Sequence, residues 1–323
     1  MVGAFFWEAM VPKEWLSYTD QVELLSRRGM KIDDRAAAAS FLSRVNYYRF
    51  SGYFRYWQRE PQHGDNRFID GTAFTTVCAL YEAEQQLMTA CADLLRPLEV
   101  LFRTRFAYAY GDLVGNAGAF ARGVGFTQPP NPGAPRAEEY ALQNLDQSKE
   151  AFVAHYRDEI KQGTSYLPQA YERMPIWVAV EALSFGSLSR LIAASGESGV
   201  LDAIAASVSG SRRFLPGQVR SFVYLRNRIA HGARLWNHSV LDVPGMQPKR
   251  VRQIKKSYRQ FSDSSIYKVL VALDEVADRS GIRTGWLKNT VEPILNVSDI
   301  LAFGIATPAK YGEMPRSVLV PSE

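Results

Sequence analysis

Apolar residues recur every three or four positions along most of the chain, which is the spacing of amphipathic α-helices. A stripe of this kind in residues 74–102 predicts a long helix, and Pro97 inside it predicts a kink or break near Asp93. A second regular stripe predicts a helix from Ile266 that ends at Gly281. Alternation of apolar and polar residues never extends far enough to predict a strand. We therefore expect an all-α fold.

The first helical signals predict a hairpin of two helices. Ser17 or Thr19 is placed to cap one helix that ends at Gly29, and Asp33 and Asp34 are placed to open the second. The segment that follows is dense in tyrosine, phenylalanine and arginine. Its rings either pack against neighbouring helices or stack on nucleic-acid bases.

Glycine and proline are concentrated in residues 111–135, which predicts a long loop. Such a loop is either a lid beside a substrate groove or a variable insertion. Further helices are predicted on its carboxyl side, at about residues 136–160 and 202–208.

A polar cluster is predicted at the end of a helix that begins near Pro216. The apolar stripe of this helix leads, at the same spacing, to Arg226, Asn227 and His231, on the face expected to point inward. Because burying such groups is costly unless each finds a partner, they predict either a site or a satisfied polar core. A guanidinium, a carboxamide and an imidazole can together hold an anion and move a proton near neutral pH. Gly232 is expected to end the helix.

Two other places supply charged candidates. Glu99 and Arg103 stand one helical turn apart, and they form either an ordinary surface ion pair or a support for the polar cluster. Glu181 lies among apolar neighbours, one turn after Trp177. We expect its carboxylate to be buried and to need a cation or hydrogen-bond donors, from the polar cluster or from another arginine.

The formal net charge is +5 and the pI is about 9.1, which modestly favours a polyanionic partner. Basic side chains beside the polar cluster and in a run after it are candidates for gripping a phosphate backbone, and a solvated helix face is the alternative. They are Arg228, Arg234, Lys249, Arg250, Arg252, Lys255 and Lys256.

The sequence does not support a metal site, a disulfide framework or a known cofactor-binding motif. Cys78 and Cys91 are too few and too far apart for a disulfide framework or a zinc site by themselves, which favours a reducing compartment. The sequence has no phosphate-binding, dinucleotide-binding, metalloprotease or nucleophile-elbow motif, so we expect neither a metal nor a cofactor. Without a long apolar run or a signal peptide in residues 1–12, we expect a cytoplasmic protein that does not enter a membrane.

Arg226-Asn227-x-x-x-His231 resembles the Arg-x(4-6)-His signature of HEPN-domain ribonucleases, and the run that continues to Asn237 is similar to the bacterial abortive-infection (Abi, AbiD/AbiF-like) family. The segment 21–56, which contains Tyr-Tyr-Arg-Phe-Ser-Gly-Tyr, resembles the amino-terminal signature of the same family. A third similar stretch covers residues 174–188. Its predicted helix starts at Pro175, and its expected inward stripe is Trp177, Val180, Ser184 and Leu188.

We expect a single all-α domain, residues 1–323, in which the resemblance implies a HEPN-like helical bundle with the amino-terminal hairpin packed on it. The hairpin and aromatic segment would span 1–62, the bundle 74–279 and a carboxyl-terminal segment 280–323.

The function that the resemblance implies is metal-independent endoribonuclease activity in phage defence. His231 would act as general base or acid, Arg226 would hold phosphate oxygens and Asn227 would orient substrate or imidazole, with Glu181, Glu99 and Arg103 in support. HEPN nucleases pair two domains, so a homodimer is expected to supply the second proton-transfer group, because His238 lies outside the matched pattern.

Membership of the Abi family would further imply a toxin restrained by a non-coding RNA or a protein antitoxin. The alternative functions are a non-catalytic RNA-binding or scaffold protein, and a docking surface for a partner enzyme.

Overall fold

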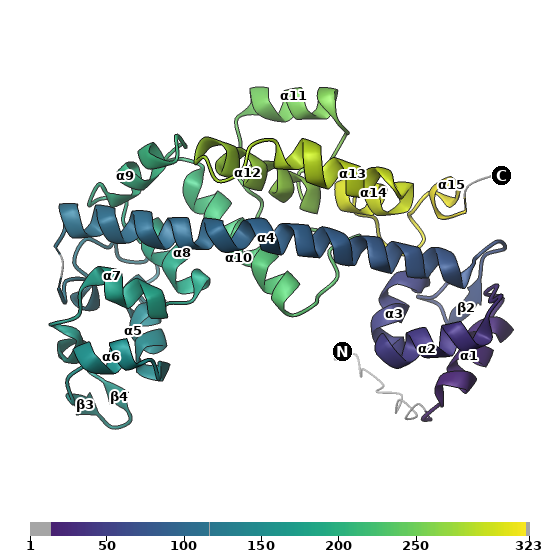
Figure 1. The fold of residues 1–323 in the computed structure, drawn as a ribbon, viewed down its shortest axis with the longest axis horizontal. Coiled ribbons are helices and arrows are strands. Elements are labelled where there is room, and N and C mark those ends of the chain that lie inside the picture. The colour runs from purple at the N-terminus through teal and green to yellow at the C-terminus, as the bar shows by residue number, and fades with distance from the viewer. Residues whose placement is uncertain (1–13, 116, 321–323) are drawn as a thin grey trace, which may run out of the picture. The chain divides into compact units, whose positions relative to one another are not determined.

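The computed structural model describes residues 14–115 and 117–320, and this part of the chain is predominantly helical (Figure 1). The all-α expectation is confirmed. Apart from isolated bridges, β structure in the described ranges is limited to two hairpins, β1 (Gln58–Glu60) with β2 (Asp65–Phe68) and β3 (Lys161–Gln162) with β4 (Ser165–Tyr166). Strands this short offer too few positions for alternation to be recognised in a sequence. The predictions made for the start of the chain concern residues 1–12 and lie outside the described residues.

The chain divides into two compact units, residues 1–82 with 309–323, and residues 83–308. The divisions expected from the sequence, at 62, 74 and 280, are not the boundaries of these units. That the whole chain forms a single domain stays a prediction.

The first unit contains the predicted helical hairpin, which the structure confirms. Ser17 caps the first helix by accepting a hydrogen bond from the backbone N–H of Asp20 at 3.2 Å. Asp34 caps the second by accepting from the N–H of Ala37 at 2.9 Å. The helices of this unit are α1 (Tyr18–Arg27), α2 (Arg35–Arg44), α3 (Tyr47–Phe54), a 3₁₀ turn (Arg55–Trp57) and α15 (Arg316–Leu319).

The aromatic segment supplies the core of this unit. Phe50 packs edge-on against Phe41, with ring centroids 5.1 Å apart, and Trp57 is fully buried with its indole N–H donating to the carbonyl of Leu319 at 2.9 Å. Tyr48, by contrast, is exposed. Packing, the first of the two alternatives, therefore accounts for most rings of this segment.

Helix α4 (Phe74–Leu113) is one uninterrupted helix of 40 residues, and the boundary between the units falls within it (Figure 1). The predicted break near Asp93 is wrong, and a kink at Pro97 stays a prediction. Pro97 and Asp93, four residues before it, are both exposed. The backbone carbonyl that the proline leaves without an intrahelical donor is thus within reach of water, so the helix can continue at a modest cost.

The second unit holds the remaining helices. They are α5 (Ala137–Gln147), α6 (Ala151–Tyr156), α7 (Ile176–Ala179), α8 (Phe185–Ala194), α9 (Val200–Ser207), α10 (Leu215–Ala230), α11 (Pro248–Ser257), α12 (Ile266–Arg279), α13 (Glu292–Asn296) and α14 (Asp299–Ala306). Short 3₁₀ turns lie at Phe120–Arg122, Pro168–Tyr171 and Val180–Ala182, and a π-helical turn lies at Leu287–Val291.

Helix α12 is the most deeply buried element of this unit, and α10 and α14 pack against it. Ser265 caps its start by accepting from the N–H of Lys268 at 3.2 Å, and Gly281 follows its end with a φ of +71°, as the sequence predicts. Helix α10 also packs against α8, which in turn packs against α5. The motif helix is therefore held on two sides.

Two predicted helices are divided in the structure. The expected helix over 136–160 is split into α5 and α6 at residues 148–150. The stretch 174–188 forms α7, a 3₁₀ turn and α8, and the side chain of Trp177, expected to point inward, is 53% exposed. The loop predicted over 111–135 begins three residues later than expected, after Leu113, and is interrupted by one 3₁₀ turn. In the ranges that are described, no helix has the length and apolar character needed to cross a membrane.

Candidate functional site

The polar cluster lies at the carboxyl-terminal end of α10. This helix buries Val219, Phe222 and Leu225, and its last turn continues past the core. Asn227 and His231 are exposed, so the expected inward orientation of the cluster is wrong. Leu225 is the last fully buried residue of this helix, and Asn227 and His231 beyond it face solvent. The cluster thereby avoids the cost of burial and is open to a ligand.

Arg226 is held by neighbours within the same unit. Its Nε lies 3.6 Å from the Oε2 of Glu99 on α4, and its Nη1 donates a hydrogen bond to the Oδ1 of Asn227 at 3.2 Å. The Arg226 side chain is nevertheless 43% exposed. Its guanidinium is therefore both oriented and accessible.

Glu99 lies between two guanidinium groups. Its Oε1 accepts from the Nη2 of Arg103 at 2.6 Å, and Arg103 also donates to the backbone carbonyl of Val180. The side chains of Glu99 and Arg103 are only 15% and 11% exposed. An ordinary surface pair is thus the wrong interpretation, because the pair is largely buried and braces Arg226. Whether this bracing serves a reaction stays a prediction.

His231 is the residue that caps α10, and its backbone N–H donates to the carbonyl of Asn227 at 3.1 Å. Gly232 follows with a φ of +58°, so the expected helix end is confirmed. Within the described ranges the His231 imidazole makes no hydrogen bond and no ion pair. The ring is free to meet a ligand.

The turn after α10 is held by groups that the sequence did not single out. The buried Glu84 carboxylate accepts hydrogen bonds from the backbone N–H groups of Leu235 and Trp236, both at 2.6 Å. Arg228 donates from Nε to the carbonyl of Arg234 at 3.2 Å. Arg228 is thus engaged in the turn, although it was predicted to bind RNA. A lone glutamate in the apolar stripe of the long helix was the available signal for Glu84.

His238 is engaged with another side chain and does not take part in the cluster. Its ring is hydrogen-bonded to the hydroxyl of Tyr224. Burial, reinforced by the nearby charges of Arg228 and Arg234, lowers the pKa of His238 to about 4. His238 is neutral at physiological pH and is unsuited to donate a proton there.

Glu181 does not occupy the environment expected for it. It is exposed in the 3₁₀ turn at Val180–Ala182, and it forms no ion pair with any residue that the structure describes. The stretch bends away from a continuous helix at this point, so apolar neighbours in sequence do not surround the carboxylate. The prediction of a buried Glu181 is wrong.

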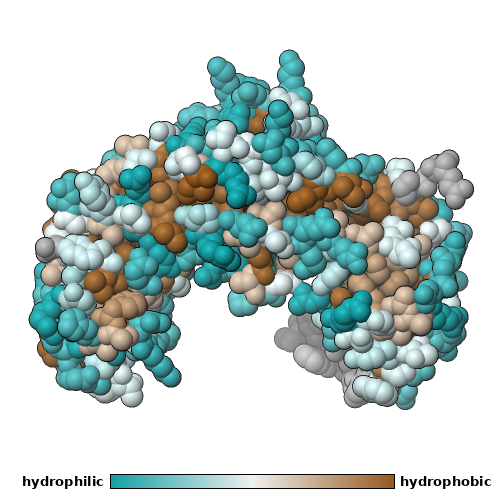
Figure 2. Space-filling model, in the orientation of Figure 1, coloured by the Kyte–Doolittle hydropathy of each residue, from teal (hydrophilic) through white to brown (hydrophobic). Residues whose placement is uncertain are grey.

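The basic run lies on α11, of which Ile254 is the buried residue. Lys255 extends over the ring of Phe261, with Nζ 4.9 Å from the centroid, and Arg250 donates to Gln253 at 3.2 Å. Figure 2 shows hydrophilic side chains protruding over this helix. In Figure 1, α11 and the end of α10 lie on opposite sides of α4. The run therefore does not flank the polar cluster.

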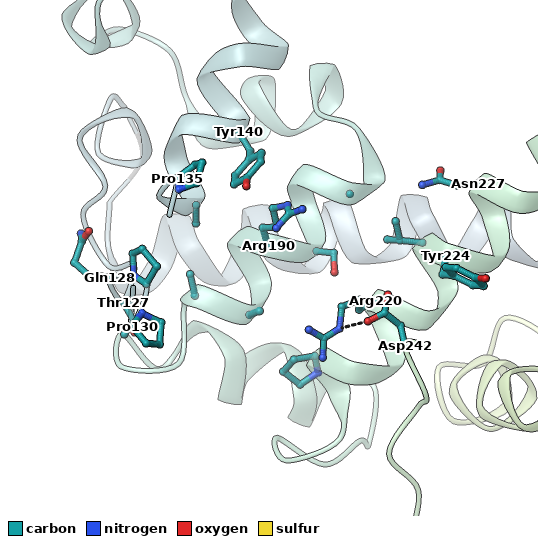
Figure 3. Close-up of a pocket in the computed structure, with 18 residues that line it drawn as sticks. Thr127, Gln128, Pro130, Pro135, Tyr140, Arg190, Arg220, Tyr224, Asn227 and Asp242 are labelled. Carbon is teal, nitrogen blue, oxygen red and sulfur yellow. Dashed lines mark ion pairs between the residues drawn. The ribbon is translucent and has the colours of Figure 1, made fainter. Parts of the chain in front are cut away.

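A groove of about 600 Å³ opens beside the cluster, between the glycine- and proline-rich loop, α5, α8 and α10 (Figure 3). Asn227 belongs both to the cluster and to the groove wall. The groove was not predicted, because its walls come from segments that are distant in the sequence. Its other principal polar and aromatic residues are Tyr140, Arg190, Arg220, Tyr224 and Asp242.

Metal-ligating side chains do not gather in groups of three or more in the part of the chain that the structure describes. The groups available at the cluster are a braced guanidinium, a carboxamide and an accessible imidazole. Groups of these types are chemically able to bind an anion and to exchange a proton with it.

Fold and site together define an all-α protein with an exposed Arg-Asn-x-x-x-His cluster at a helix end. The comparison with family models matches residues 40–237, well over half of the chain, to the Abi-like protein family. The chain belongs to this family, and with it to the proteins of abortive infection, which is a defence against phage. None of the curated proteins and none of the solved structures matches the chain.

Proposed function

We propose that this protein is a metal-independent endoribonuclease of abortive infection, of the HEPN type. RNA carries its own nucleophile, the 2'-hydroxyl. The proposed reaction forms a bond from the 2'-oxygen to phosphorus and breaks the bond from phosphorus to the 5'-oxygen. One group accepts the 2'-proton and another protonates the departing 5'-oxygen, which leaves a 2',3'-cyclic phosphate and a 5'-hydroxyl.

The observation that supports this proposal is that Arg226 is braced by Glu99 and yet exposed, five residues before an accessible His231 at the end of the same helix. Arg226 would hold the non-bridging phosphate oxygens and stabilise the charge that gathers there, because a fixed cation needs no reorganisation during the reaction. His231 would move the proton. Asn227 would orient the substrate or the imidazole.

A homodimer is part of the proposal, since one cluster offers one proton-transfer group. Exposed apolar side chains on α4 support a second copy as the partner. Val100 and Tyr108, about two turns apart on α4, are 56% and 79% exposed. The exposed Trp177 ring lies beside the same stretch of α4, near Gly111. Apolar surface of this kind is typical of a protein interface.

The proposed biology follows from the family. A nuclease that acts on the RNA of its own cell has to be restrained until infection, and we propose a non-coding RNA or a protein antitoxin as the restraint.

The decisive experiment incubates the purified chain with RNA in EDTA and identifies the new ends by mass spectrometry. We expect cyclic-phosphate ends from the wild type and none from His231→Ala, while His155→Ala, a matched change at another exposed histidine, leaves cleavage intact. Cleavage that survives His231→Ala, or that requires magnesium, would refute the proposal. RNA binding without cleavage would favour a non-catalytic RNA-binding protein. A tight complex with another protein, without RNA binding and without cleavage, would favour a docking surface.

A further inference from the structure

The groove beside the polar cluster continues the face of α10 that carries the motif. The residues of α10 that line it are Pro216, Arg220, Val223, Tyr224 and Asn227, at helical spacings of three and four. The next position on the same face is His231. From Pro216 to Asn227 the helix rises about 16 Å, so the groove is a track along α10 rather than a compact hole.

The opposite wall explains why a groove exists between packed helices. Helix α8 presents Gly186, Ser189 and Ala193 to it, and side chains this small leave the space open. Beyond α8, the rim is formed by the loop that ends at Pro135, with Pro129 and Pro130 adding apolar ring surface. Figure 3 shows the loop residues at one end, and Tyr224 and Asn227 at the other.

Two arginines, Arg190 and Arg220, and one carboxylate, Asp242, line this track. Arg190 lies over the ring of Tyr140, with its guanidinium carbon 4.1 Å from the centroid. It makes no ion pair with any described carboxylate. Arg220 pairs with Asp242 at 3.2 Å, but both side chains are substantially exposed, so the pair is weak and open to exchange for a phosphate. Figure 3 shows these groups between the two ends of the groove.

We propose that this groove binds a single-stranded segment of the RNA adjoining the cleaved bond. Arg190 and Arg220 hold its backbone phosphates, and bases contact the prolines and the Tyr140–Arg190 stack. Single strands are recognised in this way, by a basic groove with planar surfaces for the bases, whereas a duplex keeps its bases stacked inside and out of reach of these surfaces. This inference deepens the proposed function and rests on it for the identity of the ligand.

The test measures binding separately from cleavage. A fluorescent single-stranded RNA that is 2'-O-methylated lacks the nucleophile, so its binding by anisotropy in EDTA does not depend on catalysis. We expect it to bind the wild type, and annealing it to a complementary strand should weaken binding. Ala193→Trp, at an exposed position on the groove wall, should weaken binding about tenfold by filling the groove.

Arg190 provides a second line of evidence that does not depend on filling the groove. Arg190→Gln should lower the slope of log affinity against log salt by about 0.7, the value for one phosphate contact of a single strand. Arg190→Lys should keep that slope. The matched control is Arg283→Gln, an exposed arginine beside a different hollow lined by Gln85, Gln86 and Asp93, and it should change neither the affinity nor the slope.

The failures of the two proposals are distinguishable. If the wild type cleaves RNA while Ala193→Trp and Arg190→Gln bind the methylated strand normally, the groove inference is overturned and the nuclease stands. If the wild type never cleaves but both variants lose binding, the groove inference stands and the nuclease is overturned. Tighter binding of the duplex than of the single strand would also overturn the groove inference.

Discussion

Replacing Glu99 with glutamine is the most informative single change at the polar cluster. Glutamine keeps the shape of the side chain and removes its charge, which leaves the guanidinium groups of Arg103 and Arg226 facing a neutral amide. Removing one partner costs about 3–5 kcal/mol for a fully buried ion pair and about 0–1 kcal/mol for an exposed one. The Arg103–Glu99 pair is largely buried, but Arg226 is 43% exposed and the amide still accepts a hydrogen bond. We therefore expect a loss of about 2 kcal/mol in the free energy of unfolding.

The assay is urea unfolding of the purified chain, with the midpoint and the slope both measured. A double-mutant cycle should assign about 1–2 kcal/mol to the coupling of Glu99 with Arg103 and about 0.5 kcal/mol or less to its coupling with Arg226. In the cleavage assay, Glu99→Gln should lower the rate about tenfold, because Arg226 loses its orientation. Glu181→Gln is the matched control at an exposed carboxylate. We expect it to lower the free energy of unfolding by about 0.5 kcal/mol or less and to leave the cleavage rate unchanged. Equal effects of the two substitutions would refute the bracing role of Glu99.

Three further predictions concern the structure around the motif. Glu84→Ala should cost about 2–4 kcal/mol and lower the melting temperature, because the N–H groups of Leu235 and Trp236 lose a buried acceptor. Gly304→Ala should cost about 2–3 kcal/mol in urea unfolding, since a Cβ there would overlap the Trp236 ring, and a cost near zero would show that the ring has room to move. The pKa of His238 is lowered to about 4, so only the unfolded chain takes up this proton as the pH falls from about 6.5 to about 4. Stability should fall over that window by up to about 3 kcal/mol, and His238→Gln should flatten the slope.

The motif helix was predictable because its signals are local. The helix start at Pro216, the end at Gly232 and the buried face through Phe222 all follow from residues within one or two turns. The exposure of its last turn was not predictable, because the point where a helix leaves the core depends on which other helices pack there. The same limit applies to Glu181, whose apolar neighbours in sequence do not surround it in space. The continuity of α4 through Pro97 was not predictable for a related reason, since the sequence does not show that Asp93 and Pro97 are exposed and that water can reach the carbonyl left without a donor.

The contacts of the candidate site join distant parts of the chain and have no signature in the sequence. Glu99 meets Arg226, and Glu84 meets the turn after α10, across more than a hundred residues. Arg190 is not predictable as a site residue, because a single arginine on a helix is usually a solvated side chain. In the structure Arg190 lines the groove, and the spacing of residues in the sequence cannot show this. The family match, by contrast, follows from local motifs, and these were recognisable in advance.

Besides the accessible His231, the proposed reaction requires a second proton-transfer group. Cleavage by the 2'-hydroxyl needs a group that takes a proton and a group that gives one. Within residues 83–308, His238 is neutral at physiological pH and occupied by Tyr224, and His155 lies on α6, which Figure 1 shows well apart from the end of α10. A lone cluster therefore offers one proton-transfer group and leaves it facing solvent. A second copy of the cluster across a two-fold axis would supply the missing group and would exclude water from both. The exposed side chains of Val100 and Tyr108 on α4 are apolar surface that such a copy would cover.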